Sequence, residues 1–136
     1  MRVLLIGTGR LGSLIAQAAP TAAATVTVAL GSGDNGEGRG ITAAACAQAD
    51  VAIDVSRAEA VLANVTALAT HGLPVVIGTT GWHAQYEQVR GVAEHAGVGV
   101  VAAPNFSLGA AVLAALAAEA ARLLRERPEF GAFVYE

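Results

Sequence analysis

The segment Gly7-Thr8-Gly9-Arg10-Leu11-Gly12 has the composition of a phosphate-binding turn. It follows the apolar run Val3-Leu4-Leu5-Ile6 and opens a helix-like run through Ala19, the order of a dinucleotide-binding motif. The first glycine permits a tight turn, the second lets the backbone approach a pyrophosphate, and the third lets the helix pack on the strand. The helix N-terminus adds free N–H groups and a positive dipole end. The alternative is a turn that only closes a strand–helix corner.

A second small-residue segment, Gly78-Thr79-Thr80-Gly81, follows a later apolar run. Its glycines allow close approach of a ligand to the backbone, while two hydroxyls and several N–H groups remain available. We therefore expect a ligand-binding role. The alternative is a turn in which Thr80 caps a helix that starts near Trp82-His83.

Two further segments bear on the choice of cofactor. In Pro104-Asn105-Phe106-Ser107, Ser107 could cap the last helix, while the amide of Asn105 and the ring of Phe106 could face a nicotinamide. The acidic residue that binds ribose hydroxyls should end the second strand, but Leu30 is followed by Gly31-Ser32 and no carboxylate occurs before Asp34. Ser32 and Arg39 would tolerate a 2′-phosphate. We therefore expect NADPH or NADH, with a lean to NADPH.

Other reactive residue types offer no catalytic group. Asp54 ends a strand but has no His or Lys near it in sequence, so a nucleophile or general base is not expected there. The single cysteine, Cys46, is expected to be a small buried residue. His71, His83 and His95 lack ligand-like spacing, so surface or capping roles are expected and no metal site is predicted.

The elements that position these segments alternate between short β-branched runs and Ala-rich runs. This alternation predicts one α/β domain with a doubly wound parallel sheet and helices on both faces. The expected strands are Arg2–Ile6, Thr25–Leu30, Val51–Val55, Pro74–Ile77, Val98–Ala102 and Ala132–Tyr135. The expected helices are Arg10–Ala19, Ile41–Ala47, Ala58–Thr70, His83–Ala96 and Leu108–Arg127. Gly31–Gly40 is expected to be a mobile surface loop. The unusual segments all follow strands, which predicts a site along one rim of the sheet.

Composition excludes several classes of protein. The chain has 136 residues, 14% of them charged, and a net charge of −3, which gives no nucleic-acid-binding patch. No apolar run reaches the roughly 18 residues of a membrane span. The chain starts a strand near Met1 without a signal peptide, so a cytoplasmic location is expected.

The combined motifs resemble a known family. The glycine-rich turn, Asp54-Val55-Ser56, Gly78-Thr79-Thr80-Gly81-Trp82 and the segment 103–109, Ala-Pro-Asn-Phe-Ser-Leu-Gly, are similar in order and spacing to the cofactor-binding part of 4-hydroxy-tetrahydrodipicolinate reductases of lysine and diaminopimelate biosynthesis. The resemblance implies a Rossmann-like domain that binds NADH or NADPH, with hydride transfer to a cyclic dicarboxylate. The implied cofactor-binding residues are Gly7, Thr8, Gly9, Arg10, Leu11, Gly12, Ser32, Ser56, Gly78, Thr79, Thr80, Ala103, Asn105 and Phe106. Thr80 and Gly81 are implied to bind substrate.

The chain also departs from this family. Family members continue past a strand like Phe133-Val134-Tyr135-Glu136 into a His-His pair, a Lys and a carboxylate-binding segment, and they form tetramers through that second domain. The present sequence ends at Glu136 and contains no Lys. We therefore expect an N-terminal fragment or truncated form, residues 1–136 being one NAD(P)-binding domain, which binds cofactor but turns over little or nothing. The alternative is a non-catalytic NAD(P)-sensing module. A different dehydrogenase would not account for the two later motifs.

Overall fold

The computed structural model describes residues 1–127 and residue 130. In these residues the strands form one parallel sheet in the order β2-β1-β3-β4-β5. The strands are β1 Arg2–Ile6, β2 Thr25–Leu30, β3 Val51–Asp54, β4 Val75–Ile77 and β5 Val100–Ala102. The α-helices are α1 Arg10–Ala18, α2 Ala43–Cys46, α3 Val61–Thr70, α4 Tyr86–Ala96 and α5 Leu108–Leu123. Short 3-10 turns are η1 Ala19–Ala22, η2 Gly36–Gly38, η3 Ala58–Ala60 and η4 His83–Gln85.

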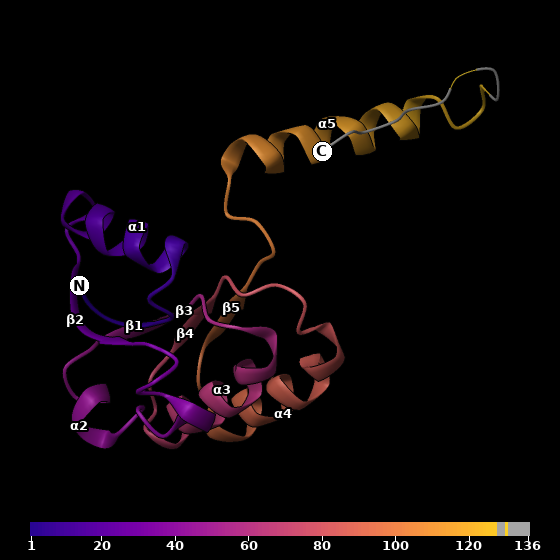
Figure 1. Ribbon diagram of the computed structural model, residues 1–136. Helices are drawn as coiled ribbons and strands as arrows, with labels where there is room; N and C mark the ends of the chain where they lie inside the picture. Colours follow the sequence, from indigo (N-terminus) through magenta and orange to yellow (C-terminus); the bar gives the residue numbers. More distant parts are fainter. Residues whose placement is uncertain (128–129, 131–136) are drawn as a thin grey trace. The chain divides into compact units, whose positions relative to one another are not determined.

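The chain divides into two compact units, Met1–Pro104 and Asn105–Glu136. In the first unit α1 lies on one face of the sheet, while α2, α3 and α4 lie on the other (Figure 1). The predicted doubly wound parallel sheet with helices on both faces is therefore confirmed. The second unit contains α5, in which no residue is buried.

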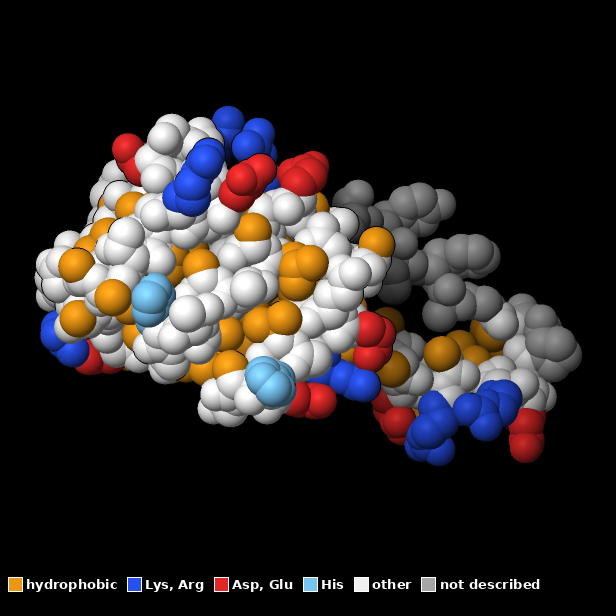
Figure 2. All heavy atoms as spheres, turned by 90° about the horizontal axis from the view of Figure 1, so that it is seen from below, with side chains coloured by type: hydrophobic (Ala, Val, Ile, Leu, Met, Phe, Trp, Pro, Cys, Tyr) orange, Lys and Arg blue, Asp and Glu red, His pale blue; other side chains and the backbone are white. Residues whose placement is uncertain are grey.

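The core of the first unit lies mainly between the sheet and α3. Val61, Val65 and Leu68 recur at helical spacing on α3, and each is at most 1% exposed. They pack in one cluster with strand residues such as Leu4 and Ile77. Seen from the side of α2, α3 and α4, hydrophobic side chains are scattered over the surface and charged groups of both signs lie mostly at its margins (Figure 2).

The opposite face of the sheet is covered less completely. Val3 is buried there with Ala19 of η1, whereas Val51 and Ile53 of β3 are only half-buried. Val101 on the edge strand β5 is 59% exposed. Coverage of this face therefore falls off from β1 toward β5.

Several predicted boundaries were wrong by a few residues. The fifth strand starts at Val100 rather than Val98, because Gly97 ends α4 in a left-handed conformation with φ +66° and the chain needs two further residues to reach the sheet. The helix predicted from Ile41 to Ala47 spans only Ala43–Cys46, capped by Thr42.

The other expected helices also differ at their ends. Those predicted from Ala58 and His83 each begin with a 3-10 turn, and the last α-helix ends at Leu123 rather than Arg127. The predicted strand Ala132–Tyr135 lies outside the described residues. No helix in the described part of the chain is long and apolar enough to cross a lipid bilayer.

The segment from Gly31 to Gly40 is not a surface loop throughout, which corrects the prediction. Asn35 is 8% exposed and Gly38 is buried. Gly38, with φ +78°, lies so close to α3 that a Cβ there would be 2.9 Å from the carbonyl oxygen of Ala63. Packing against α3 therefore fixes the middle of this segment.

Candidate functional site

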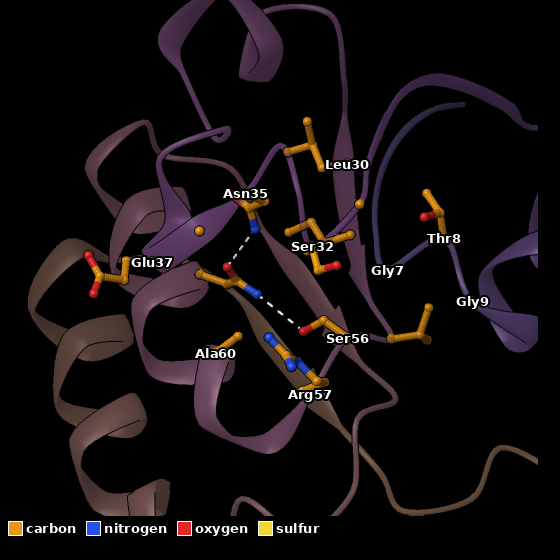
Figure 3. Close-up of a pocket in the computed structure, with 15 residues that line it drawn as sticks. Gly7, Thr8, Gly9, Leu30, Ser32, Asn35, Glu37, Ser56, Arg57 and Ala60 are labelled. Carbon is orange, nitrogen blue, oxygen red and sulfur yellow. Dashed lines mark hydrogen bonds between the residues drawn. The ribbon is translucent and has the colours of Figure 1, made fainter.

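Within the first unit, the glycine-rich turn and the segments after β2, β3 and β4 lie at the carboxyl edge of the sheet, as parallel strands require. A cavity of about 300 Å³ opens there (Figure 3). Five predicted site residues line it: Gly7, Thr8, Gly9, Ser32 and Ser56. The lining also includes residues that were not predicted to contact the cofactor, namely Ile6, Leu30, Gly31, Asn35, Gly36, Glu37, Val55, Arg57, Ala60 and Asn64.

Two glycines of the first motif are required by the protein's own packing. Gly7 has φ +102°, and a Cβ there would lie 2.4 Å from the carbonyl oxygen of Val55. A Cβ on Gly12 would lie 1.9 Å from the carbonyl oxygen of Gly7. These glycines therefore let β1, α1 and the segment after β3 approach one another.

Gly9 differs from both. Its φ of −73° is open to any residue, and no atom lies within 4 Å of a Cβ built on it. It is the N-cap of α1, it provides no side-chain cap, and the first turn of α1 contains no acidic residue. No acidic side chain occupies this helix end, and the space around position 9, which lines the cavity, is open, as a phosphate at a helix N-terminus requires.

Arg10 and Leu11 form the start of α1, and both are exposed. Neither lines the cavity. Their side chains are therefore available to a ligand only outside it, and their predicted role depends on their backbone N–H groups.

The end of β2 carries no carboxylate, as its sequence indicated, but two charged residues reach the cavity from elsewhere. Glu37 comes from η2 and Arg57 from the segment after β3, and they lie at different places on its wall (Figure 3). Arg39 does not line the cavity, and its Nε donates to the carbonyl oxygen of Gly36 at 3.1 Å. Arg57 therefore replaces Arg39 as the arginine that faces this space.

Asp54, the last residue of β3, is fully buried rather than exposed at the rim. Its Oδ1 accepts hydrogen bonds from the backbone N–H and hydroxyl of Ser56 and from the hydroxyl of Thr79 at 3.1 Å. Its Oδ2 accepts from Nδ2 of Asn64 at 2.9 Å. All four donors are neutral, and among the described residues no basic side chain forms an ion pair with Asp54.

The second predicted segment follows β4 and lines a smaller cavity of about 110 Å³. Thr79 and Thr80 line it together with Trp82, His83, Tyr86, Ala102, Ala103 and Pro104. Trp82 is 8% exposed and stacks on Tyr86 with ring centroids 6.0 Å apart and an interplanar angle of 20°. The structure thus brings three predicted cofactor residues, Thr79, Thr80 and Ala103, to one cavity.

The hydroxyls of this segment differ in availability. That of Thr79 is buried and is used in the bond to Asp54, so the expectation that both hydroxyls are available was wrong. Thr80 is exposed, and it caps no helix, because the N-cap of η4 is Trp82. Gly78 donates its N–H to the carbonyl oxygen of Asp54 at 2.8 Å, and Gly81 has φ +84°.

Asn105 and Phe106 belong to the second unit. Oδ1 of Asn105 accepts the N–H of Ser107 at 2.7 Å, and Phe106 is 58% exposed. Ser107 is the N-cap of α5 and accepts the N–H of Ala110 at 3.3 Å, as predicted. Contact of Asn105 and Phe106 with a nicotinamide stays a prediction.

The remaining candidates behave as small core or surface residues. Cys46 is buried as predicted, and burial raises the pKa of its thiol. His71, His83 and His95 are exposed. In the described residues no group of three His, Cys, Asp or Glu side chains is arranged to hold a metal ion.

Asn64 and Asn35 are the most important site residues that were not predicted as contacts, because both belong to the buried hydrogen-bond network. A signal for Asn64 exists, because it interrupts the buried stripe Val61, Val65 and Leu68 of α3, where a polar side chain needs a buried partner. Asn35 gives no such signal, since it lies in a Gly-rich segment where asparagine is common in turns.

A parallel sheet in this strand order, with a glycine-rich turn and an open helix N-terminus at its carboxyl edge, defines a Rossmann-like nucleotide-binding domain. Comparison with known proteins gives a more specific result. Residues 1–106 match the family model described as dihydrodipicolinate reductase, N-terminus. The chain therefore belongs to the dihydrodipicolinate reductase family and corresponds to the N-terminal part of its members.

Curated relatives carry the same family name. The chain is 40% identical over 126 residues to the 4-hydroxy-tetrahydrodipicolinate reductase of Beutenbergia cavernae, a match that covers 89% of this chain and 48% of that protein. It is 29% identical over 136 residues to the enzyme of the same name from Christiangramia forsetii, covering 100% of this chain and 55% of that protein. The chain thus spans about half the length of these relatives.

Proposed function

We propose that this chain binds NADPH or NADH as the cofactor-binding part of a 4-hydroxy-tetrahydrodipicolinate reductase. Gly9 is the observation that carries the proposal, because neither its backbone conformation nor a neighbouring atom requires a glycine there. A ligand that approaches the backbone does require one. The family match over residues 1–106 supports a nucleotide as that ligand.

The proposed pose follows the two cavities. The pyrophosphate would lie at Gly9 and the N-terminus of α1, and the adenosine would extend toward Ser32, Glu37 and Arg57. The nicotinamide would lie toward Thr80, at the second cavity. When bound, the reduced nicotinamide would supply a hydride to a small dicarboxylate substrate of the longer enzyme, which we expect to be a cytoplasmic homotetramer.

Within these 136 residues we expect little or no turnover. General acid catalysis contributes roughly 10²–10⁴-fold, and the sequence has no lysine to supply it. His83 lines the second cavity, but it is exposed, and no partner in the described residues is seen to orient it. The chain's own contribution is therefore to bind and orient the cofactor.

Calorimetric titration of the purified chain with NADPH and NADH tests this proposal, with ATP as the control that lacks a nicotinamide. We expect saturable binding of at least one dinucleotide, with ATP weaker because it cannot reach the segment after β4. Absence of binding by both dinucleotides would refute the proposal. A reductase assay on the same protein should give little or no turnover, and activity comparable to a complete enzyme would refute the second part.

A further inference from the structure

The buried carboxylate of Asp54 joins two loops of the candidate site and helix α3. Ser56 is the second residue after β3, Thr79 is the second residue after β4, and Asn64 belongs to α3. Each donates a hydrogen bond to this one side chain. Asp54 lines neither cavity, so it holds the loops without direct access to a ligand.

Asn64 extends the same connection to the segment after β2. Its Nδ2 faces Asp54, because the side chain of Asp54 accepts a hydrogen bond from each of these partners. Its Oδ1 then accepts Nδ2 of Asn35 at 2.8 Å, which leaves Oδ1 of Asn35 to accept the N–H of Gly40 at 3.1 Å. Every amide along this chain of hydrogen bonds has one allowed orientation, and Asp54 determines it. Figure 3 shows Asn35 and Ser56 directed toward this connection from opposite sides.

The network is complete within the protein. In the described residues no buried side-chain nitrogen or oxygen lacks a partner. Asn64 and Asp54 are both 0% exposed, so water cannot replace a lost partner without a rearrangement. If a donor replaces an acceptor at position 54, we therefore expect the loops that bond to it to move, because no water can compensate for the lost hydrogen bond.

We propose that Asp54 is a positioning residue for cofactor binding, which acts through Asn64 and Asn35 to keep the loops after β2, β3 and β4 in one arrangement. The inference rests on the proposed function, because Asn35, Ser56 and Asn64 line the cavity assigned to the dinucleotide and Thr79 lines the adjacent one. Asp54 itself is assigned no contact with cofactor or substrate.

The substitution Asp54→Asn should disrupt this arrangement while preserving size. If the new amide directs its oxygen toward Ser56, its NH₂ group meets the NH₂ group of Asn64. If it turns the other way, its NH₂ group meets the backbone N–H of Ser56. Either orientation places two donors face to face, and Asn64→Asp would instead place two carboxylates face to face.

The exchanged pair D54N/N64D should restore the network. In the exchanged pair, the amide at position 54 accepts from Ser56 and Thr79 through its oxygen and donates to the carboxylate at position 64. That carboxylate still accepts Nδ2 of Asn35. The carboxyl group and the matches named here are kept, with donor and acceptor exchanged between positions 54 and 64. The weaker bond that Nδ2 of Asn64 donates to Oγ of Ser56 at 3.3 Å is lost.

The test measures dissociation constants of NADPH and NADH by calorimetry for the wild-type chain, both single variants and the exchanged pair, well below each melting temperature. Circular dichroism identifies the folded variants. We expect at least about tenfold weaker binding for each single variant, and recovery to within about threefold for the pair. Val89→Ala, a core position that lines neither cavity, controls for lost stability alone, and it should lower the melting temperature without changing the dissociation constant.

The outcomes separate the two proposals. Wild-type protein that binds neither dinucleotide refutes the proposed function and, with it, this inference. Wild-type binding that persists unchanged in folded D54N, or an exchanged pair that is folded but binds no better than the single variants, overturns this inference alone. If a single variant does not fold, the exchanged pair still decides: near wild-type binding supports the inference, and weak binding of the folded pair or failure of the pair to fold overturns it.

Discussion

Substitution of Gly9 and Gly12 by alanine should separate ligand binding from folding within one motif. A methyl group on Gly9 meets no atom within 4 Å, and the backbone there has an ordinary φ of −73°. The loss of a glycine N-cap and the reduced entropy of the unfolded chain act in opposite directions at this position. We therefore expect the free energy of unfolding of G9A to stay within about 0.5 kcal/mol of wild type.

Substitution of Gly12 by alanine should instead lower the stability of the fold. A Cβ there would lie 1.9 Å from the carbonyl oxygen of Gly7, where real Cβ contacts stay above 3.0 Å, so α1 must move by about 1 Å. Overpacking of this kind costs about 1–3 kcal/mol. Urea denaturation should show this loss for G12A as a lower midpoint.

For dinucleotide binding we expect the opposite order, with G9A more damaging than G12A. The methyl group of G9A fills the space where we place a phosphate, so we expect at least about tenfold weaker dinucleotide binding, or about 1.4 kcal/mol. Calorimetry on folded G9A measures this loss. A G9A variant that binds both dinucleotides as wild type does would show that the phosphate is not there. Unchanged stability of G12A would refute the packing argument.

Three further predictions concern stability and reactivity. Leu68→Ala removes a fully buried core side chain and should lower the free energy of unfolding by about 2–5 kcal/mol, measured by denaturation with the slope unchanged. The hydrogen bonds from Arg2 lower the pKa of Asp50, so this pair contributes stability above about pH 4 that is lost as the pH falls through the lowered pKa. D50N should therefore flatten the acid limb of a stability–pH curve, and an unchanged acid limb would count against the pair. Burial raises the pKa of Cys46, so at neutral pH a thiol reagent should label the native chain at least about 100-fold more slowly than the unfolded chain, and equal rates would contradict this.

The sheet was predictable because its signals are local. β1 and β2 have the predicted bounds, since a β-branched or Leu-rich run ends at a glycine in each case, at Gly7 and at Gly31. β5 was less predictable, because its start depends on how Gly97 closes α4. The rim location of the site followed from the parallel sheet alone, since every strand ends at the same edge.

The polar interior of the site was not predictable to the same degree. Asn64 lies 10 residues from Asp54 and 29 residues from Asn35, and each residue type is common in turns and helix ends. Their joint burial depends on the packing of α3 against the segment after β2, which no local pattern encodes. The same contact explains why that segment was mistaken for a surface loop.

The stacked indole of Trp82 gives the chain an internal optical reporter. It is the sole tryptophan in the sequence, so all indole emission comes from one position next to the segment after β4. Tryptophan emission overlaps the absorption band of reduced nicotinamides. A dinucleotide seated as proposed would therefore quench this emission by energy transfer, whereas a nucleotide without the nicotinamide would not, and a fluorimeter would distinguish the two without any label.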